Sequence, residues 1–156
     1  MTMGLAEDEG FMRLAIEASR RALDEGNVPF GASLVKDGAL VHVSRNNQIT
    51  DSDLMGHAEV VLVREVVKEK GRDALKGATV YASGEPCAMC SGTMFWAGVA
   101  RVVFGATQAD IIEALGGAEL PIRTENVLAG AKPAVTVVGP VLREEAMAVL
   151  RRFGRF

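Results

Sequence analysis

Apolar residues recur at steps of three and four from about residue 7 to residue 25, which predicts an amphipathic helix. Gly26 follows this stretch and is a natural C-terminal stop. Two short apolar runs come next, at 30–36 and 39–44, and Asp37-Gly38 between them favours a tight hairpin turn. Polar, turn-prone residues then fill 45–55, which we expect to be a loop.

The rest of the chain alternates between helical and strand patterns. Helices are predicted at about 56–70, 86–97, 107–115 and 142–153, with Pro86 well placed in the first turn of its helix. Apolar runs at 78–82, 101–104 and 134–138 predict strands, whereas 116–133 is the least regular stretch. Strands joined by helices should run parallel. The chain is therefore predicted to be α/β, with a mixed sheet of about five strands, an antiparallel first hairpin and helices on both faces.

The composition is that of one globular domain spanning residues 1–156, with 49% hydrophobic and 24% charged residues. No run approaches the ~20 apolar residues of a membrane span. The acidic start, Met1 to Glu9, is not typical of a secretory signal, so we expect a cytoplasmic protein that does not contact membranes. A net charge of −3 lacks the global basic excess of nucleic-acid binders, so nucleic acid is not an expected partner.

Two cysteines, Cys87 and Cys90, stand at the start of the helix predicted at 86–97. In a chain expected to be cytoplasmic, such a pair favours a metal site or a redox dithiol over a structural disulfide. His57 lies at the start of the helix predicted at 56–70 and would be a third ligand for Zn²⁺, leaving the open fourth position of a catalytic site. Zinc lowers the pKa of water in that position to about 7. Glu59 could take and return the water's proton without binding the metal.

Three alternatives remain open for these residues. Cys87 and Cys90 could be a redox pair, although that interpretation leaves His57 and Glu59 unexplained. His42 could complete a closed, structural zinc site in a protein that is not an enzyme. The alternation of residues around His42 favours a surface or edge histidine instead. Glu59 could also be a surface charge.

The pattern His-x-Glu followed by Pro-Cys-x-x-Cys is the signature of zinc deaminases. Along nearly its whole length the chain resembles the cytidine-deaminase-like superfamily, and especially the branch of bacterial guanine deaminases, fungal cytosine deaminases and tRNA adenosine deaminases. The residues that carry the resemblance are Pro29-Phe30-Gly31, Asn46, His57-Ala58-Glu59, Glu85-Pro86-Cys87-Ala88-Met89-Cys90 and Arg101-Val102-Val103-Phe104-Gly105. The resemblance implies a three-layer α/β/α fold, bound Zn²⁺ with a catalytic water, hydrolytic deamination of a base, and a homodimer.

The resemblance also implies a base-binding pocket. Asn46 stands eleven residues before His57, the spacing at which family members carry a base-contacting asparagine, and Asn47 beside it is the alternative. Either asparagine could instead be a turn residue. Phe30 and Ala58, within the shared motifs, are expected to line the same pocket.

Three further residues match guanine deaminases in particular. Trp96 stands where those enzymes carry a tryptophan that lines the base pocket, and its alternative is the hydrophobic core. Asp110 matches an aspartate that accepts a hydrogen bond from the 2-amino group of guanine, and its alternative is helix capping or the surface. The aromatic C-terminus, Phe156, could cap the pocket.

We therefore expect a zinc-dependent nucleobase deaminase of the guanine type that releases ammonia. Its substrate would be a free base or related heterocycle with a 2-amino group, which includes guanine, isocytosine or a triazine. The alternatives are a tRNA-specific adenosine deaminase and a cytosine deaminase. The arginine-rich end, 151–156, is the feature that favours RNA. Its alternative is a solvated face of the last helix.

Overall fold

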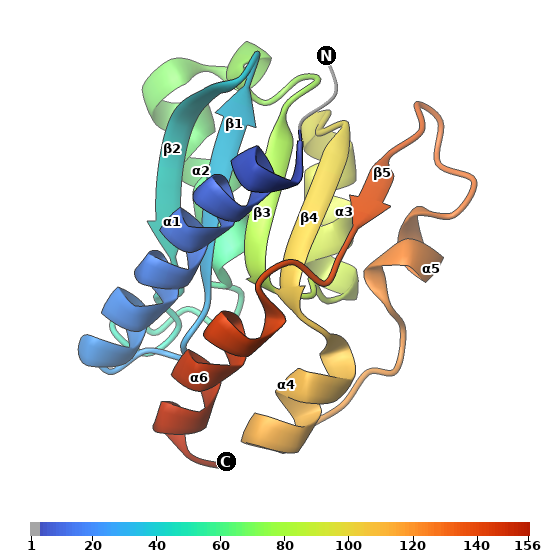
Figure 1. The fold of residues 1–156 in the computed structure, drawn as a ribbon. Helices are drawn as coiled ribbons and strands as arrows, with labels where there is room; N and C mark the ends of the chain where they lie inside the picture. Colours follow the sequence, from blue (N-terminus) through green and yellow to red (C-terminus); the bar gives the residue numbers. More distant parts are fainter. Residues whose placement is uncertain (1–3) are drawn as a thin grey trace.

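In the computed structural model, which describes residues 4–156, a five-stranded sheet lies between helices (Figure 1). Residues 1–3 lie outside the described residues, and they are part of the acidic start that we expect not to be a secretory signal. The strand order is β2-β1-β3-β4-β5. The strands are β1 (Gly31–Lys36), β2 (Ala39–Arg45), β3 (Thr79–Gly84), β4 (Arg101–Ala106) and β5 (Thr136–Val138).

The pairing confirms the predicted mixed sheet. β1 runs antiparallel to both β2 and β3, whereas β3, β4 and β5 are parallel to one another. The turn between β1 and β2 places Asp37 and Gly38 at positive φ, 52° and 77°. Positive φ at both central residues matches the right-handed twist of a hairpin, and Asp-Gly tolerates it well.

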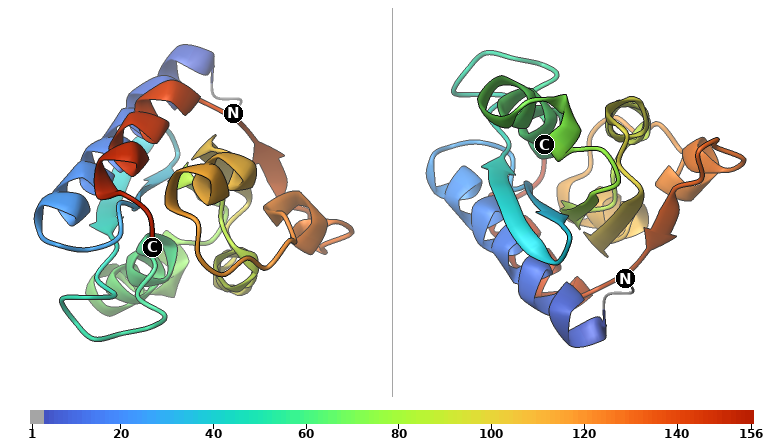
Figure 2. Two further views of the ribbon diagram at one scale, coloured as in Figure 1. Left: turned by 90° about the horizontal axis from the view of Figure 1, so that it is seen from below. Right: turned by 90° about the horizontal axis from the view of Figure 1, so that it is seen from above.

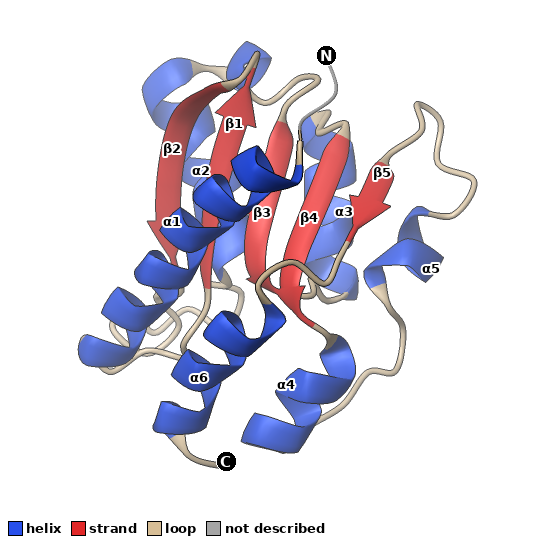
Figure 3. Ribbon diagram, viewed as in Figure 1, coloured by secondary structure: helices blue, strands red, loops and turns tan. Residues whose placement is uncertain are grey.

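Helices cover both faces of the sheet, as Figures 2 and 3 show. One face carries α1 (Leu5–Asp24) and α6 (Arg143–Phe153), and the other carries α2 (Ala58–Lys70) and α3 (Ala88–Ala97). A short 3₁₀ turn, Arg72–Ala74, follows α2, and α4 (Gln108–Leu115) packs against α6. The stretch 116–133 contains a short helix, α5 (Thr124–Leu128), where the sequence pattern shows no regular element.

Two hydrophobic cores hold these layers together. Tyr81 of β3 packs with Met12 of α1 and Leu150 of α6, whereas its neighbour Val80 packs with Leu62 of α2 and Met94 of α3. Successive residues of a strand point to opposite faces, so β3 contributes to both cores. Among the described residues, no helix is both long and apolar enough to span a lipid bilayer.

The topology brings several helix N-termini to one end of the sheet. β2, β3 and β4 all end at the lower edge in Figure 1, and α2, α3 and α4 begin there. Chemistry in α/β sheets gathers at the carboxyl ends of strands. The expected ligands belong to two of these helix starts.

Candidate active site

The three expected metal ligands meet at this end of the sheet. His57 is the N-cap residue of α2 and Cys87 that of α3, so both precede their helices in extended backbone conformations. Cys90 lies one turn into α3 and is fully buried. The ligand atoms of the three residues all lie within 4.8 Å of one another. The positive N-terminal end of α3 favours the thiolate forms that a metal requires.

The spacing of these atoms fits zinc. Nδ1 of His57 lies 3.6 Å from Sγ of Cys87 and 3.5 Å from Sγ of Cys90. A tetrahedral Zn²⁺, with sulfur at about 2.3 Å and nitrogen at about 2.1 Å, separates the nitrogen from each sulfur by about 3.6 Å. One nitrogen and two sulfurs leave a fourth position for water or substrate. The residues therefore fit a catalytic zinc ion.

Hydrogen bonding prepares one sulfur for metal binding. Hydrogen bonds from Cys90 and His57 lower the pKa of the Cys87 thiol to about 4, although burial opposes this fall. The hydrogen bond to Cys87 correspondingly raises the pKa of His57. The lowered pKa favours the thiolate form of Cys87, which is the form that binds zinc.

Glu59 is buried beside the ligands, in the first turn of α2. Burial, followed by the charge of Cys87, raises the pKa of its carboxyl group to about 7. A carboxyl group whose pKa lies near the working pH both accepts and donates protons efficiently. The structure thus places a buried carboxyl group of raised pKa next to the three ligands, and Glu59 is not a surface residue.

His42 does not join this cluster. Its Nε2 lies 3.1 Å from Glu65 Oε1 on α2, and its Nδ1 lies 3.7 Å from Glu69 Oε2. The closed four-ligand site that the sequence left open is therefore absent from the described residues. His42 is a partly buried strand residue paired with carboxylates.

The loop 46–56, which leads into His57, is held by a network of side-chain hydrogen bonds. Asn46 is buried, and its amide bridges Gln48: Oδ1 accepts from the backbone N–H and Nδ2 donates to the side-chain oxygen. The backbone N–H of Asn46 donates to the carbonyl of Phe30 at 3.0 Å. Asn27 anchors the middle of the loop by accepting from the N–H groups of residues 49 and 50. Asn46 thus shows the turn geometry that the sequence left open.

Phe30 and Ala58 both belong to the hydrophobic core that α2 and α3 form with the sheet. Ala58, between His57 and Glu59, is fully buried. The ring of Phe30 lies over Gly84, where a Cβ atom would meet its Cε1 at 2.6 Å. Only a glycine at the end of β3 leaves room for this ring directly before the cysteine turn.

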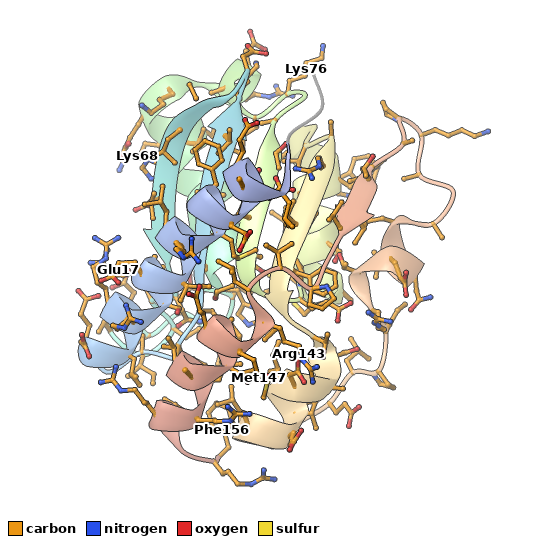
Figure 4. All side chains as sticks on the ribbon, viewed as in Figure 1. Glu17, Lys68, Lys76, Arg143, Met147 and Phe156 are labelled. Carbon is orange, nitrogen blue, oxygen red and sulfur yellow. The ribbon has the colours of Figure 1, made fainter. Side chains whose placement is uncertain are left out.

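Trp96 and Phe156 are both largely exposed. Trp96 is in the last turn of α3, and it is 83% exposed, so it is not part of the core. Phe156 is 71% exposed; its ring packs against Phe153 at a centroid distance of 5.2 Å, and its N–H donates to the carbonyl of Leu115. Figure 4 shows Phe156 at the end of the chain, below α6. Within one chain, the C-terminus therefore packs against the end of α4.

Asp110 is buried, but its carboxylate already makes hydrogen bonds within the protein. It forms a capping box with Thr107 at the start of α4. Arg143 also donates to both carboxylate oxygens, Nε at 2.7 Å and an Nη at 2.6 Å. Figure 4 shows Arg143 at the start of α6 beside α4. Asp110 thus shows the helix-capping role that the sequence left as its alternative.

Two contacts around the cysteine turn were not anticipated from the sequence. Glu85, just before Pro86, is paired with Arg123, and Ser91, just after Cys90, is hydrogen-bonded to Thr124. Glu85 stands in the motif itself, but nothing in the sequence indicated its partner. Both partners come from the stretch whose pattern predicted no regular element.

Comparison with known proteins assigns this arrangement to a family. Residues 5–106, more than half of the chain, match the family described as the cytidine and deoxycytidylate deaminase zinc-binding region. The chain belongs to this family. It is therefore a zinc-type deaminase, a hydrolase, as the ligand set and the fold both indicate.

Individual relatives differ in their substrates. A probable cytosine deaminase from Schizosaccharomyces pombe is 38% identical over 145 residues, 90% of this chain and 88% of that protein. A tRNA-specific adenosine deaminase from Bacillus subtilis is 38% identical over 102 residues, 65% of this chain and 63% of that protein. The structure of a guanine deaminase from Nitrosomonas europaea matches with a TM-score of 0.78 at 28% identity, over 93% of this chain and 83% of that one.

Proposed function

We propose that this protein hydrolyses the amino group of a free nucleobase, with guanine as the leading substrate. The observation that carries the chemistry is the cluster of His57, Cys87 and Cys90 with Glu59 buried beside it. Guanine is supported by similarity to the Nitrosomonas europaea guanine deaminase over nearly the whole chain. Because Arg143 occupies Asp110, recognition of a 2-amino group is not assigned to that residue.

The residues of this chain divide the work of deamination. A zinc ion held by His57, Cys87 and Cys90 supplies a water activated at neutral pH. Glu59 accepts one proton from the attacking water and delivers it to the ring nitrogen, and it then accepts the second proton from the newly added hydroxyl group and delivers it to the departing amine. One water is consumed, ammonia leaves, and a carbonyl replaces the amine. Phe30 and Ala58 provide the apolar wall that excludes other water from the base.

Replacing Glu59 tests this mechanism. Glu59→Ala should retain stoichiometric zinc but lose nearly all ammonia release, because proton transfer typically contributes about 10²–10⁴-fold. Glu69→Gln, on an exposed part of the same helix, is the matched control and should keep full activity. A fully active Glu59→Ala protein would refute the role of this carboxylate.

An ammonia-release screen over purine, pyrimidine and triazine bases, with nucleosides as controls, tests the substrate. Guanine should have the highest kcat/KM. Cytosine deamination is the second candidate, since the Schizosaccharomyces pombe relative covers 90% of the chain. A preference for cytosine over guanine would overturn the guanine proposal but leave the chemistry intact.

The C-terminal arginines argue against an RNA substrate. Arg151 lies 3.7 Å from Glu144 and Arg152 lies 3.6 Å from Asp24, while Arg155 donates to the carbonyl of Glu113. Two of these three arginines face a carboxylate, which offsets part of their attraction for phosphate groups. Binding of an anticodon stem-loop with steep salt dependence, together with adenosine deamination, would instead identify a tRNA enzyme.

We further propose a homodimer that uses the outer surface around Trp96. The exposed indole stands between two hollows, one lined by Val63, Val67 and Leu75 and the other by Phe95 and Leu128. Exposed apolar patches of this kind commonly mark protein interfaces. Trp96→Arg should therefore convert a dimer to a monomer in light scattering. Leu5→Arg, at another exposed apolar residue, should not, and a monomeric unaltered protein would refute the proposal.

A further inference from the structure

The cysteine turn, residues 86–90, is held at its entrance by a buried carboxylate. Glu85 precedes the turn, and its side chain is only 1% exposed. Arg123 Nε donates to Glu85 Oε2 at 3.0 Å, and the backbone N–H of Gln108 donates to Oε1 at 2.7 Å. The backbone N–H of Glu85 also donates to the carbonyl of Ala106. The chain that leads into Cys87 is therefore tied to Arg123 and to the start of α4.

The end of the same turn is held through Ser91, the residue that directly follows it. Ser91 follows Cys90, and its hydroxyl group shares a hydrogen bond of 2.6 Å with that of Thr124. Both residues are fully buried, so no solvent competes for this bond. Arg123 and Thr124 are consecutive, and one short segment thus holds both ends of the turn. These two residues are called the Arg123–Thr124 clamp.

The segment that carries the clamp is itself anchored. Gln108 Nε2 donates to the carbonyl of Leu120 at 2.8 Å, three residues before the clamp. On the other side, Leu128 at the end of α5 is buried in the same core as Met94 of α3. The clamp therefore has a fixed position relative to α3, which is what it needs to position the two sulfurs.

We propose that the Arg123–Thr124 clamp positions Cys87 and Cys90 for zinc and thereby controls how long the ion stays in the folded protein. Neither residue is among the metal ligands, so both are positioning residues. Groups that orient metal ligands typically change metal affinity by about 10–100-fold when they are removed. The proposal requires the zinc site, but it does not depend on which base is deaminated.

Zinc release to an excess of a chromogenic chelator tests the proposal, at a temperature where every variant is folded by circular dichroism. Arg123→Met and Thr124→Val should each accelerate release by about 10-fold. Thr124→Ser keeps the hydroxyl group and should release zinc as slowly as the unaltered protein. Cobalt in place of zinc gives a second readout, because the thiolate charge-transfer bands should shift in the first two variants and not in Thr124→Ser.

Two control variants separate positioning from general stability. Arg13→Met removes an exposed ion pair with Glu145, and Ser33→Ala removes a buried hydroxyl that donates to the carbonyl of Phe11. Both should release zinc at the rate of the unaltered protein.

The proposal would be refuted if the clamp variants had the same zinc release rates and cobalt spectra as these controls. If Thr124→Val does not fold, Arg123→Met decides by the same criterion, since the Arg123 side chain is 46% exposed. No substrate is present in these measurements. An ammonia screen that overturns the choice of base therefore leaves this result standing, and a refuted clamp leaves the proposed function standing.

Discussion

The bond between Asp110 and Arg143 should stabilise the fold by an amount that depends on pH. Hydrogen bonds from Arg143, followed by those from Thr107, lower the pKa of Asp110 from 3.8 to about 2. Each pKa unit corresponds to about 1.36 kcal/mol, so this difference represents at most about 2.4 kcal/mol. The Arg143 side chain is 51% exposed, and solvent screening reduces the figure to about 1 kcal/mol. Asp110→Asn should lower the free energy of unfolding by about that amount at pH 7.

The sign of the pH dependence follows from the lowered pKa. A carboxyl group with a lower pKa in the folded state stabilises above its unfolded pKa, and this contribution is lost as pH falls. The difference between the unaltered protein and Asp110→Asn should therefore be constant above about pH 5 and shrink between about pH 4 and pH 2. Urea unfolding at several pH values measures it, with Asp24→Asn as the control at an exposed ion pair. A cost that is independent of pH, or equal to the control, would refute the reasoning.

The same variant separates two roles for Asp110. If the carboxylate only caps α4 and binds Arg143, Asp110→Asn should keep kcat/KM for the preferred base within a few-fold. If Asp110 contacted a 2-amino group, the loss would be selective for bases that carry that group, because a site built for a hydrogen bond strongly discriminates against its absence.

Three further outcomes are expected. Gly31→Ala should lower the free energy of unfolding in urea by about 3 kcal/mol or more, because its Cβ would lie 2.2 Å from the carbonyl oxygen of Ala15. The control Gly10→Ala, in open space on α1, should be neutral or stabilise by up to about 1 kcal/mol. Equal effects of the two variants would contradict the packing. Tyr81→Phe should cost about 1.5 kcal/mol, since the buried hydroxyl donates to Asp8 at 2.6 Å, and a cost below about 0.5 kcal/mol would show that this bond contributes nothing. Adding zinc at 100 times its Kd to the metal-free protein should raise the free energy of unfolding by about 2.7 kcal/mol, and an unchanged thermal midpoint would count against the metal site.

Local patterns explain why much of the fold and site was predictable. The period of apolar residues indicated ten of the elements, since each pattern is set by residues within a few positions. Cys87 and Cys90 could be named as a ligand pair because they stand three residues apart at a helix start, where such spacing lets both side chains reach one metal. His57 lies 30 residues before Cys87, and the shared His-x-Glu motif rather than local spacing indicated it. The departures were at α5 and at element ends, where packing rather than periodicity decides the conformation.

Long-range packing decided the rest. Arg123 lies 38 residues from Glu85 along the chain, and Arg143 lies 33 residues from Asp110, so no local pattern could pair them. Whether Trp96 lies in the core, in the pocket or on the surface depends on which face of α3 packs against the sheet, a choice that the weakly amphipathic pattern of α3 does not specify. The sequence by itself indicated the His57, Cys87 and Cys90 cluster, the carboxyl group of Glu59 as a candidate proton carrier, and the layered α/β architecture. Only the tertiary structure decided which distant side chains hold those ligands in place, because such contacts form only when the whole chain is folded.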